Sequence, residues 1–302
     1  MLSRITLRQI EYFVAVAESG SIIIASERIH VSSPSISAAI AHIESELNVQ
    51  LFIRQHAKGL VLTDIGEQIK QACKVILSQS SGLYALSADV SGAMRGTLKV
   101  GCFSAFAPMI YAEIIHGFSN LYKQVNLETV IDDHQALTQD LMQNTLDVAL
   151  LYDLHIDSNY INFMPLADLP PYVLLAESHP LAKQQAVTLK ELVDYPMILL
   201  DMPYSNDYFL SLFRHQKLQP NVIETSKHVD VIRSMVGNNI GYTILNVRPK
   251  MDYSPDGKKL VMVRISGDVR PMKIGIATPV NANIGKICQA FISRCQAFIS
   301  SQ

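Results

Sequence analysis

The chain has 302 residues, 49% of them hydrophobic, and its 25 lysines and arginines nearly balance 27 acidic residues. This length exceeds one small domain and allows two or three hydrophobic cores. The net charge of −2 excludes a polycation that binds its partners through bulk charge. The first residues, Met1 to Arg4, lack the apolar region of a secretion signal, and no apolar run is long enough to span a membrane. We therefore expect a cytoplasmic protein without membrane contacts.

Three short helices are predicted near the N-terminus. Leu7 to Ser19 and Ser21 to Ile29 carry apolar residues at helical spacing. A third helix follows a polar corner, with Ser32 or Ser33 as its N-cap and Pro34 in the first turn, where the missing N–H costs nothing. Its apolar face is made of Ile36, Ile40, Ile43 and Leu47.

The opposite face of this third helix is small or able to form hydrogen bonds. It carries Ser33, Ser35, Ser37, Ala38 and His42. A helix that is apolar behind and small and polar in front can enter a DNA major groove while its back packs on a scaffold. An ordinary helical pair in a small domain is the alternative interpretation of this stretch by itself.

Two strand-like runs come next, Leu51 to Arg54 and Leu60 to Thr63, and the loop between them turns at Gly59. Such a wing would bring Arg54 and Lys58 to phosphate or to the minor groove. Residues 1–58 contain five basic and five acidic side chains, so the basic footprint is weak. DNA binding then requires that the cations lie on one face and that a dimer doubles the contacts.

A long helix is predicted from Thr63 or Asp64 to about Val90. Its apolar residues follow a near-heptad pattern: Ile65, Ile69, Ala72, Ile76, Leu83, Leu86 and Val90. This seam either packs on its own domain or pairs with the same helix of a second chain. The small residues from Ser91 to Gly96 then form a hinge.

Strands and helices alternate beyond the hinge, as strands at Leu98–Gly101, Val125–Ile131 and Asp147–Leu151 and helices at Pro108–Tyr122 and Gln135–Asn144. This βαβαβ order predicts a mostly parallel sheet with ligand sites at the carboxyl ends of its strands. A second α/β unit begins near Pro165, and a last strand and helix would return to the first unit.

The N-terminal motifs resemble those of LysR-type transcriptional regulators. They follow the family's order and spacing over the first 66 residues: Leu7 to Phe13, Glu18 to Ser21, Ala25 to Ile29, Ser32 to Ser37, Ile43 to Leu47, Leu51 to Arg54 and Leu62 to Gly66. The chain departs from the family at Ile22 to Ile24, at Ser33, where glutamine is usual, and at Ala38, where many members have a cation. Base preference therefore cannot be transferred from other members.

The resemblance implies an α/β multidomain protein. It would have a winged helix-turn-helix at residues 1–63, a linker and dimerisation helix at 64–91, and an effector-binding domain at 92–302. The last resembles periplasmic solute-binding proteins, with lobe I at 97–164 and 269–302 and lobe II at 165–268. The implied partners are double-stranded operator DNA, a small-molecule effector of unknown identity, a second chain paired through the linker helix, and a dimer of dimers, that is, a homotetramer. RNA polymerase is a further candidate partner, and no cofactor is expected.

Within this scheme we expect two kinds of DNA contact. Ser33, Pro34, Ser37 and His42 would face bases or groove walls, and Ser32, Ser35 and Ala38 share their surface. Arg28, Arg54 and Lys58 would mainly contact phosphate or the minor groove.

Most effector-binding candidates lie in loops that follow predicted strands, and Tyr242 lies in a Gly-bordered loop whose counterpart often lines the pocket in the family. The candidates are Phe103, Ser104, Phe106, Asp133, Tyr152, Asp201, Tyr204, Ser205, His228 and Tyr242. Ordinary interpretations exist for several of them: Ser205 is expected to cap a helix whether or not it binds anything, and Phe106 and Tyr204 could be core residues.

The charge of these loops bears on the effector class. They contain Asp132, Asp133, Asp153, Asp201 and Asp207 but no lysine or arginine. If these carboxylates point inward, an amine or a neutral compound is favoured over an anion. A small carboxylate or an aromatic acid, as many family members bind, is the alternative.

Enzyme motifs are absent from the sequence. There is no phosphate-binding P-loop, nucleophile elbow, zinc-protease motif or dinucleotide fingerprint, and the histidines and the four cysteines show no metal-ligand spacing. We expect neither enzyme activity nor a metal site. An α/β ligand-binding protein or an enzyme with an oligomerising helical head remains the alternative.

Overall fold

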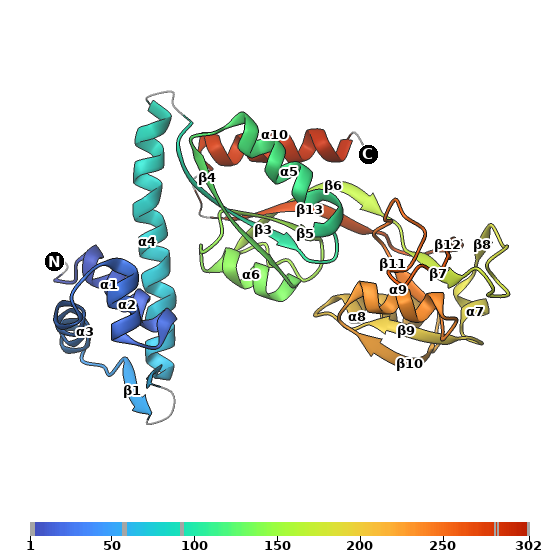
Figure 1. Cartoon of the computed structure of the whole chain (residues 1–302), viewed down its shortest axis with the longest axis horizontal. Coiled ribbons are helices and arrows are strands. Elements are labelled where there is room, and N and C mark those ends of the chain that lie inside the picture. Colours follow the sequence, from blue (N-terminus) through green and yellow to red (C-terminus); the bar gives the residue numbers. More distant parts are fainter. Residues whose placement is uncertain (1–3, 56–58, 91–93, 281, 283, 301–302) are drawn as a thin grey trace. The chain divides into compact units, whose positions relative to one another are not determined.

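A computed structural model describes residues 4–55, 59–90, 94–280, 282 and 284–300 (Figure 1). The chain divides into two compact units, one formed mainly by Met1–Met94 and the other by Arg95–Met142 and Leu146–Gln302.

The first unit contains three short helices, a two-stranded antiparallel sheet and a long helix. Their bounds are α1 (Leu7–Ser19), α2 (Ile22–Ile29), α3 (Ser33–Leu47), β1 (Phe52–Gln55), β2 (Gly59–Leu62) and α4 (Asp64–Val90). The side chains of Thr6, Ser21 and Ser32 accept hydrogen bonds from the first turns of α1, α2 and α3, and Thr63 does the same for α4 through Gly66. The first turns are thus fixed by local sequence, which is why they match the prediction.

The three helices and the wing share one core. Phe13, Val16, Ile36 and Leu51 are completely buried in it, and α4 contributes Cys73. Each large apolar side chain contributes about 1.5–3 kcal/mol by leaving water. Because Cys73 of α4 is buried in this core, the long helix is part of the first unit. Leu47, predicted on the apolar face of α3, is exposed because it lies in the last turn, beyond the core.

The second unit begins with a five-stranded sheet, which we call lobe I. Its strands are β3 (Gly96–Phe103), β4 (Val125–Asp132), β5 (Val148–Tyr152), β6 (Ile161–Leu169) and β13 (Met272–Pro279), in the order β4-β3-β5-β13-β6. Helices α5 (Ala107–Leu121) and α10 (Lys286–Ser300) lie on one face, and α6 (His134–Met142) lies on the other (Figure 1).

The prediction of a mostly parallel sheet is wrong. β3 pairs with β4 and β5 in parallel, but β13 is antiparallel to both β5 and β6. The sheet is mixed because β6 leads into the other lobe and β13 returns from it in the opposite direction. β6 was also missed in the sequence, because Pro165 interrupts its strand pattern. The structure accommodates Pro165 at a register shift of this edge strand.

Lobe II is built from two smaller sheets and three helices. The elements are β7 (Tyr172–Ala176), β8 (Ala186–Val187), α7 (Leu189–Leu192), β9 (Pro196–Leu200), α8 (Ser205–His215), β10 (Asn221–Ser226), α9 (Val229–Gly237), β11 (Thr243–Leu245) and β12 (Leu260–Ile265). One sheet has the order β11-β7-β12-β8, with β7 antiparallel to both neighbours, and the other pairs β9 with β10 in parallel. The sequence did not predict β8 and β12.

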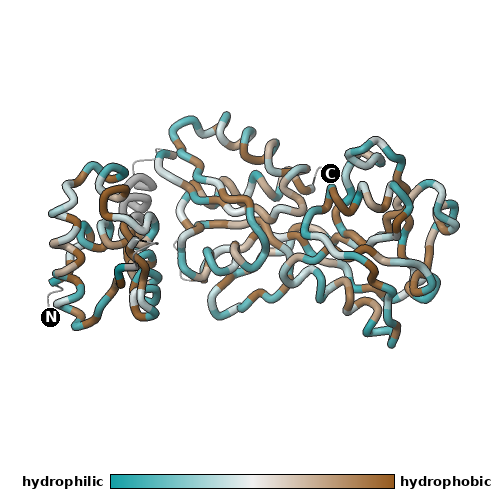
Figure 2. Tube along the Cα trace, turned by 60° about the horizontal axis from the view of Figure 1, so that its bottom comes forward, coloured by the Kyte–Doolittle hydropathy of each residue, from teal (hydrophilic) through white to brown (hydrophobic). Residues whose placement is uncertain are grey.

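Figure 2 shows hydrophobic residues gathered along the central strands of each lobe, whereas the covering helices alternate between hydrophobic and hydrophilic positions. This distribution places the cores between sheets and helices. The predicted combination of a winged helix-turn-helix, a long helix and a two-lobed α/β domain is confirmed.

Candidate functional site

The two faces of α3 differ as the sequence indicates. Ile36, Ala39, Ile40 and Ile43 are buried against the core, and Ser32 caps the helix by accepting a hydrogen bond from the Ser35 amide. The opposite face carries the predicted DNA-contacting residues: Ser32, Pro34, Ser35, Ser37 and Ala38 are exposed, and Ser33 and His42 are partly exposed. The structure thus brings these seven residues onto one accessible surface.

His42 is held in place from α1. Gln9 lies with its side-chain nitrogen 3.3 Å from Nδ1 of His42, and the same side chain takes part in the capping box at Thr6. A contact between α1 and α3 therefore restricts the orientation of the imidazole ring. Sequence analysis identified His42 but not this partner.

The wing is attached to α3 and α4 by polar contacts. The Glu44 carboxylate accepts hydrogen bonds from the amides of Leu51 and Phe52, at 2.7 and 3.4 Å. Gly66, at the start of α4, lies so close to the wing that a Cβ there would come within 2.3 Å of the Leu51 carbonyl oxygen. These contacts fix the direction of the wing relative to α3.

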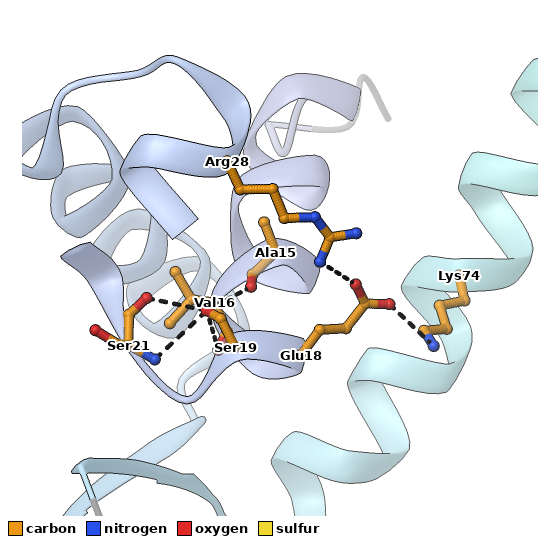
Figure 3. Close-up of polar contacts among 7 residues, drawn as sticks. All are labelled: Ala15, Val16, Glu18, Ser19, Ser21, Arg28 and Lys74. Carbon is orange, nitrogen blue, oxygen red and sulfur yellow. Dashed lines mark hydrogen bonds and ion pairs between the residues drawn. The ribbon is translucent and has the colours of Figure 1, made fainter. Parts of the chain in front are cut away.

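One carboxylate joins three helices of this unit (Figure 3). Glu18, at the end of α1, accepts from Arg28 of α2 at 2.9 Å and pairs with Lys74 of α4 at 3.2 Å. Burial by itself would raise the pKa of Glu18, but the hydrogen bonds from Arg28 and Lys74 outweigh it and hold the pKa below its ordinary value. Next to it, the Ser19 hydroxyl donates to carbonyls at Ala15 and Ser21 and stabilises the turn into α2.

The cations of the first unit, among them the predicted phosphate contacts Arg28 and Arg54, therefore differ in their availability. Arg28 is paired with Glu18, and Arg4 is paired with Glu46 at 3.6 Å. Arg8 and Arg54 make no ion pair in the part of the chain that the structure describes, and both are exposed. Lys58, the wing cation, lies outside the described residues.

A cavity of about 690 Å³ opens between the two lobes of the second unit. This volume is in the range of small-molecule sites. Lobe I contributes the loop after β3, the end of β5 and Met272, and lobe II contributes the starts of α8 and α9 and the segment from Leu245 to Pro255.

Five of the ten effector-binding candidates lie on the cavity wall: Phe103, Ser104, Tyr152, Ser205 and His228. The other five do not line it. Phe106 and Tyr242 are buried in the cores of their lobes, and Tyr204 stacks on His155 with ring centroids 4.3 Å apart. The expectation that Ser205 caps α8 is wrong, because Tyr204 is the N-cap residue, in a left-handed conformation, and Ser205 is the first residue of the helix.

The two acidic candidates are engaged elsewhere. Asp133 accepts a hydrogen bond from the Ala136 amide in the first turn of α6, and Asp201 accepts from the Asn206 side chain. Asp153 pairs with Arg270 at 2.7 Å, and Asp207 lies 3.7 Å from Arg214. None of these four carboxylates lines the cavity.

Sequence analysis missed several cavity residues that carry charge or bulk. Lys227, Asp230 and Arg233 surround the first turns of α9, and four methionines, Met109, Met202, Met251 and Met272, supply much of the apolar wall. His228, the N-cap residue of α9, was among the candidates, and the first turns that follow it could have been included with it. The segment around Met251 has no such signal, since it lies between strands β11 and β12.

The described residues contain buried cysteines and no cluster of metal-ligating side chains. All four thiols are buried, and burial raises the pKa to about 11 for Cys73 and about 12 for Cys102, Cys288 and Cys295. Within the described ranges no group of three or more histidine, cysteine, aspartate or glutamate side chains could hold a metal ion. No helix among the described residues is long and apolar enough to cross a membrane.

Comparison with known families accounts for nearly the whole chain. Residues 7–67 match the bacterial regulatory helix-turn-helix domain of the lysR family, and residues 91–299 match the LysR substrate binding domain. The chain belongs to the LysR family of transcriptional regulators. The relatives are named as regulators rather than enzymes, as the sequence predicted.

Individual relatives extend over most of the chain. The HTH-type transcriptional regulator YvbU of Bacillus subtilis is 30% identical over 80% of this chain and 81% of its own length. The crystal structure of HinK, a LysR family transcriptional regulator from Pseudomonas aeruginosa, has 33% identity and a TM-score of 0.67, covering 98% of this chain and 99% of that chain. A full-length OxyR variant from Pseudomonas aeruginosa has a TM-score of 0.77 at 23% identity, covering 97% and 98%, and supports the fold.

Membership assigns the two units their general roles. The winged unit is the DNA-binding part of this LysR-family protein, and the two-lobed unit is its effector-binding domain.

Proposed function

We propose that this LysR-family regulator binds operator DNA in the cytoplasm as a dimer, inserts α3 into the major groove, and changes its operator binding when a small molecule occupies the cavity. The surface of α3 carries the proposal: it presents seven small or hydrogen-bonding residues while its back is buried in the core. A dimer of dimers and a contact with RNA polymerase are part of the same proposal and are supported by the family alone.

DNA binding by α3 is tested with duplexes from upstream of the gene. Fluorescence anisotropy should detect specific binding that weakens with salt, because phosphate contacts release counterions. Ser33→Ala should change the order of affinities among operator variants, whereas Arg54→Ala should weaken all duplexes by a similar factor. The same uniform loss is expected for Lys58→Ala. If Ser33→Ala and Arg54→Ala changed sequence preference equally, the assigned roles would be wrong.

Dimerisation through α4 has a structural basis in the described part of the helix. Ile69 packs on the core of the first unit, whereas Ile65 and Ile76 are 40% and 45% exposed. With Ala72, which is also exposed, they form an apolar row at intervals of seven and four residues. Such a row suits a second α4, since two helices can bury it together.

The oligomeric state tests this part of the proposal. Ile76→Glu should shift the protein from dimers or tetramers toward smaller species in sedimentation velocity. Ile24→Glu is the matched control, since Ile24 is a similarly exposed isoleucine on α2. If both variants kept the wild-type distribution, the described turns of α4 would not form the dimer interface.

The positions of the aspartates bear on the effector class. The expectation of an amine or neutral effector assumed that the aspartates of the strand-end loops point into the cleft. Asp133, Asp153, Asp201 and Asp207 instead hold caps and ion pairs away from the cavity wall. Because these carboxylates do not face the cavity, their charge no longer favours an amine. The alternative effector class, a small carboxylate or an aromatic acid, is therefore favoured.

A further inference from the structure

Arg233 is a buried cation without a counter-ion. It lies in the second turn of α9, is only 6% exposed, and lines the cavity. Its Nη2 donates to the carbonyl oxygens of Met251 and Tyr253, at 2.9 and 2.7 Å, and its Nη1 has no hydrogen-bond partner. No carboxylate lies within ion-pair distance of it in the described part of the chain.

An unpaired buried charge is unusual because it loses hydration without gaining a partner. Two carbonyl oxygens compensate one side of the guanidinium, but they supply only dipoles. The neighbouring cavity therefore experiences the field of a full positive charge at low dielectric, where attraction for an anion is far stronger than in water.

The net charge at this end of the cavity has the same sign. The start of α9 has no side-chain cap, and the partial positive charge of a helix N-terminus favours anions. Two cationic side chains, Lys227 and Arg233, and one carboxylate, Asp230, line this part of the cavity. Asp230 and Lys227 are both exposed, so solvent screens their opposing effects more than it screens Arg233.

One buried polar atom on the wall is a hydrogen-bond acceptor and would attract a donor rather than an anion. Oδ1 of Asn246 has no partner, while the amide nitrogen donates to the Leu169 carbonyl and the Tyr208 hydroxyl. This oxygen could accept a hydrogen bond from a hydroxyl or an amine. It is a neutral dipole, however, so it opposes the field of Arg233 only at short range.

The remaining wall is apolar and adaptable. Met109, Met202, Met251 and Met272 line it together with Phe103 and Phe209. Methionine side chains are flexible and polarisable, so they adjust to ligands of different shape better than branched side chains. An effector that used this wall would need an apolar body as well as a charged end.

We infer that the effector is an amphipathic organic anion. Its charged end lies by Arg233 and the first turn of α9, and its apolar body lies against the methionine wall. The assignment rests on the proposed function, because it takes the interlobe cavity as the effector site.

A matched set of ligands tests this inference on the full-length protein. We would use 4-phenylbutyrate, 4-phenylbutylamine and 4-phenylbutanol, which share one apolar body and differ in charge. Thermal shift and calorimetric titration should show binding of the acid at least about ten-fold tighter than that of the amine, with the alcohol between them. Binding of the amine more tightly than the acid, or no binding of any of the three, would overturn the inference.

Charge variants locate the charged end. Arg233→Met should abolish the preference for the acid, and Arg233→Lys should retain part of it. Since Arg233 also holds the segment at Met251, Lys227→Gln and Asp230→Asn provide exposed alternatives that leave this contact intact. Lys227→Gln should weaken the acid several-fold, and Asp230→Asn should strengthen it. Lys190→Gln, an exposed lysine on α7 away from the cavity wall, is the control and should change nothing.

Operator binding is measured on the same preparations without ligand. A wild type that binds its operator but shows no preference for the acid overturns only the ligand assignment. A wild type that binds no operator overturns the proposed function instead.

Discussion

The junction at Glu18 yields a quantitative prediction about how the DNA-binding part is attached to the linker helix. Glu18→Gln keeps the shape of the side chain but removes the charge that pairs with Arg28 and Lys74. The Glu18 side chain is 32% exposed, so each pair contributes only about 0.2–1 kcal/mol. The carboxylate also stands at the C-terminal end of α1, where the helix dipole disfavours it by about 0.3–1 kcal/mol. The net expected loss is about 0.5 kcal/mol.

Hydrogen exchange followed by mass spectrometry is the suitable assay, because the chain contains no tryptophan and has more than one cooperative unit. A loss of about 0.5 kcal/mol should speed exchange through local opening about two-fold in peptides from α1, α2 and the first turns of α4. Peptides from lobe II serve as the internal control and should not change.

The pH dependence has a defined sign. The pKa of Glu18 is lower in the folded protein than in the unfolded chain, so its stabilising effect is present above the unfolded value. It is lost as the pH falls through the lowered, folded value. The difference between wild type and Glu18→Gln should therefore shrink in acid.

A double-mutant cycle decides whether the ion pair itself is responsible. Lys74→Met removes the α4 partner, and the double variant with Glu18→Gln should be less destabilised than the sum of the two single variants. Strictly additive effects, or a difference between wild type and Glu18→Gln that persisted in acid, would refute the reasoning. In the DNA-binding assay, Glu18→Gln should also steepen the salt dependence, because it releases Arg28 to contact phosphate.

Three further predictions concern a turn after α8, the reactivity of the thiols and the position of the wing. Lys217 follows α8 in a left-handed conformation with φ 56° and is exposed, so Lys217→Gly should raise the stability of the second unit by about 0.5–1 kcal/mol in thermal denaturation; a decrease would show that its side chain is needed. The four cysteines, with raised thiol pKa values of about 11 for Cys73 and about 12 for the others, should react with iodoacetamide far more slowly in the native protein than in urea at neutral pH, and rapid native alkylation would contradict their burial. Gly66→Ala should weaken operator binding more than Ser32→Ala, which removes a cap worth about 1 kcal/mol, because the added Cβ would clash with the Leu51 carbonyl and push the wing away from α4. Equal losses would argue against a rigid wing.

Local chemistry in the sequence was enough to locate the helices of the first unit. Ser32 and Pro34 define the start of α3, and the spacing of Ile36, Ile40 and Ile43 defines its buried face. Caps and periodicity act within a few residues, so they can be recognised without knowing what lies across the core. The ion pair of Arg28 could not be recognised in this way, because its partner Glu18 belongs to another helix.

The interlobe cavity shows where such reasoning ends. Topology correctly indicated loops at strand ends, and Ser104, Tyr152 and His228 do line the cavity. Topology does not determine the direction of a side chain, so Asp133 was expected to face a ligand and instead caps a helix. Tyr242, expected in a Gly-bordered loop, is likewise completely buried.

The sequence by itself determined the family, the helices of the first unit and the two faces of α3. Only the tertiary structure decided that β13 returns antiparallel through lobe I, and that Arg233 is buried on the cavity wall beside a segment from Met251 to Tyr253. The physical reason is the range of the interactions involved. Helix caps and apolar spacing are set by neighbours in sequence, whereas strand direction and the pairing of a buried charge depend on segments that meet only when the chain folds.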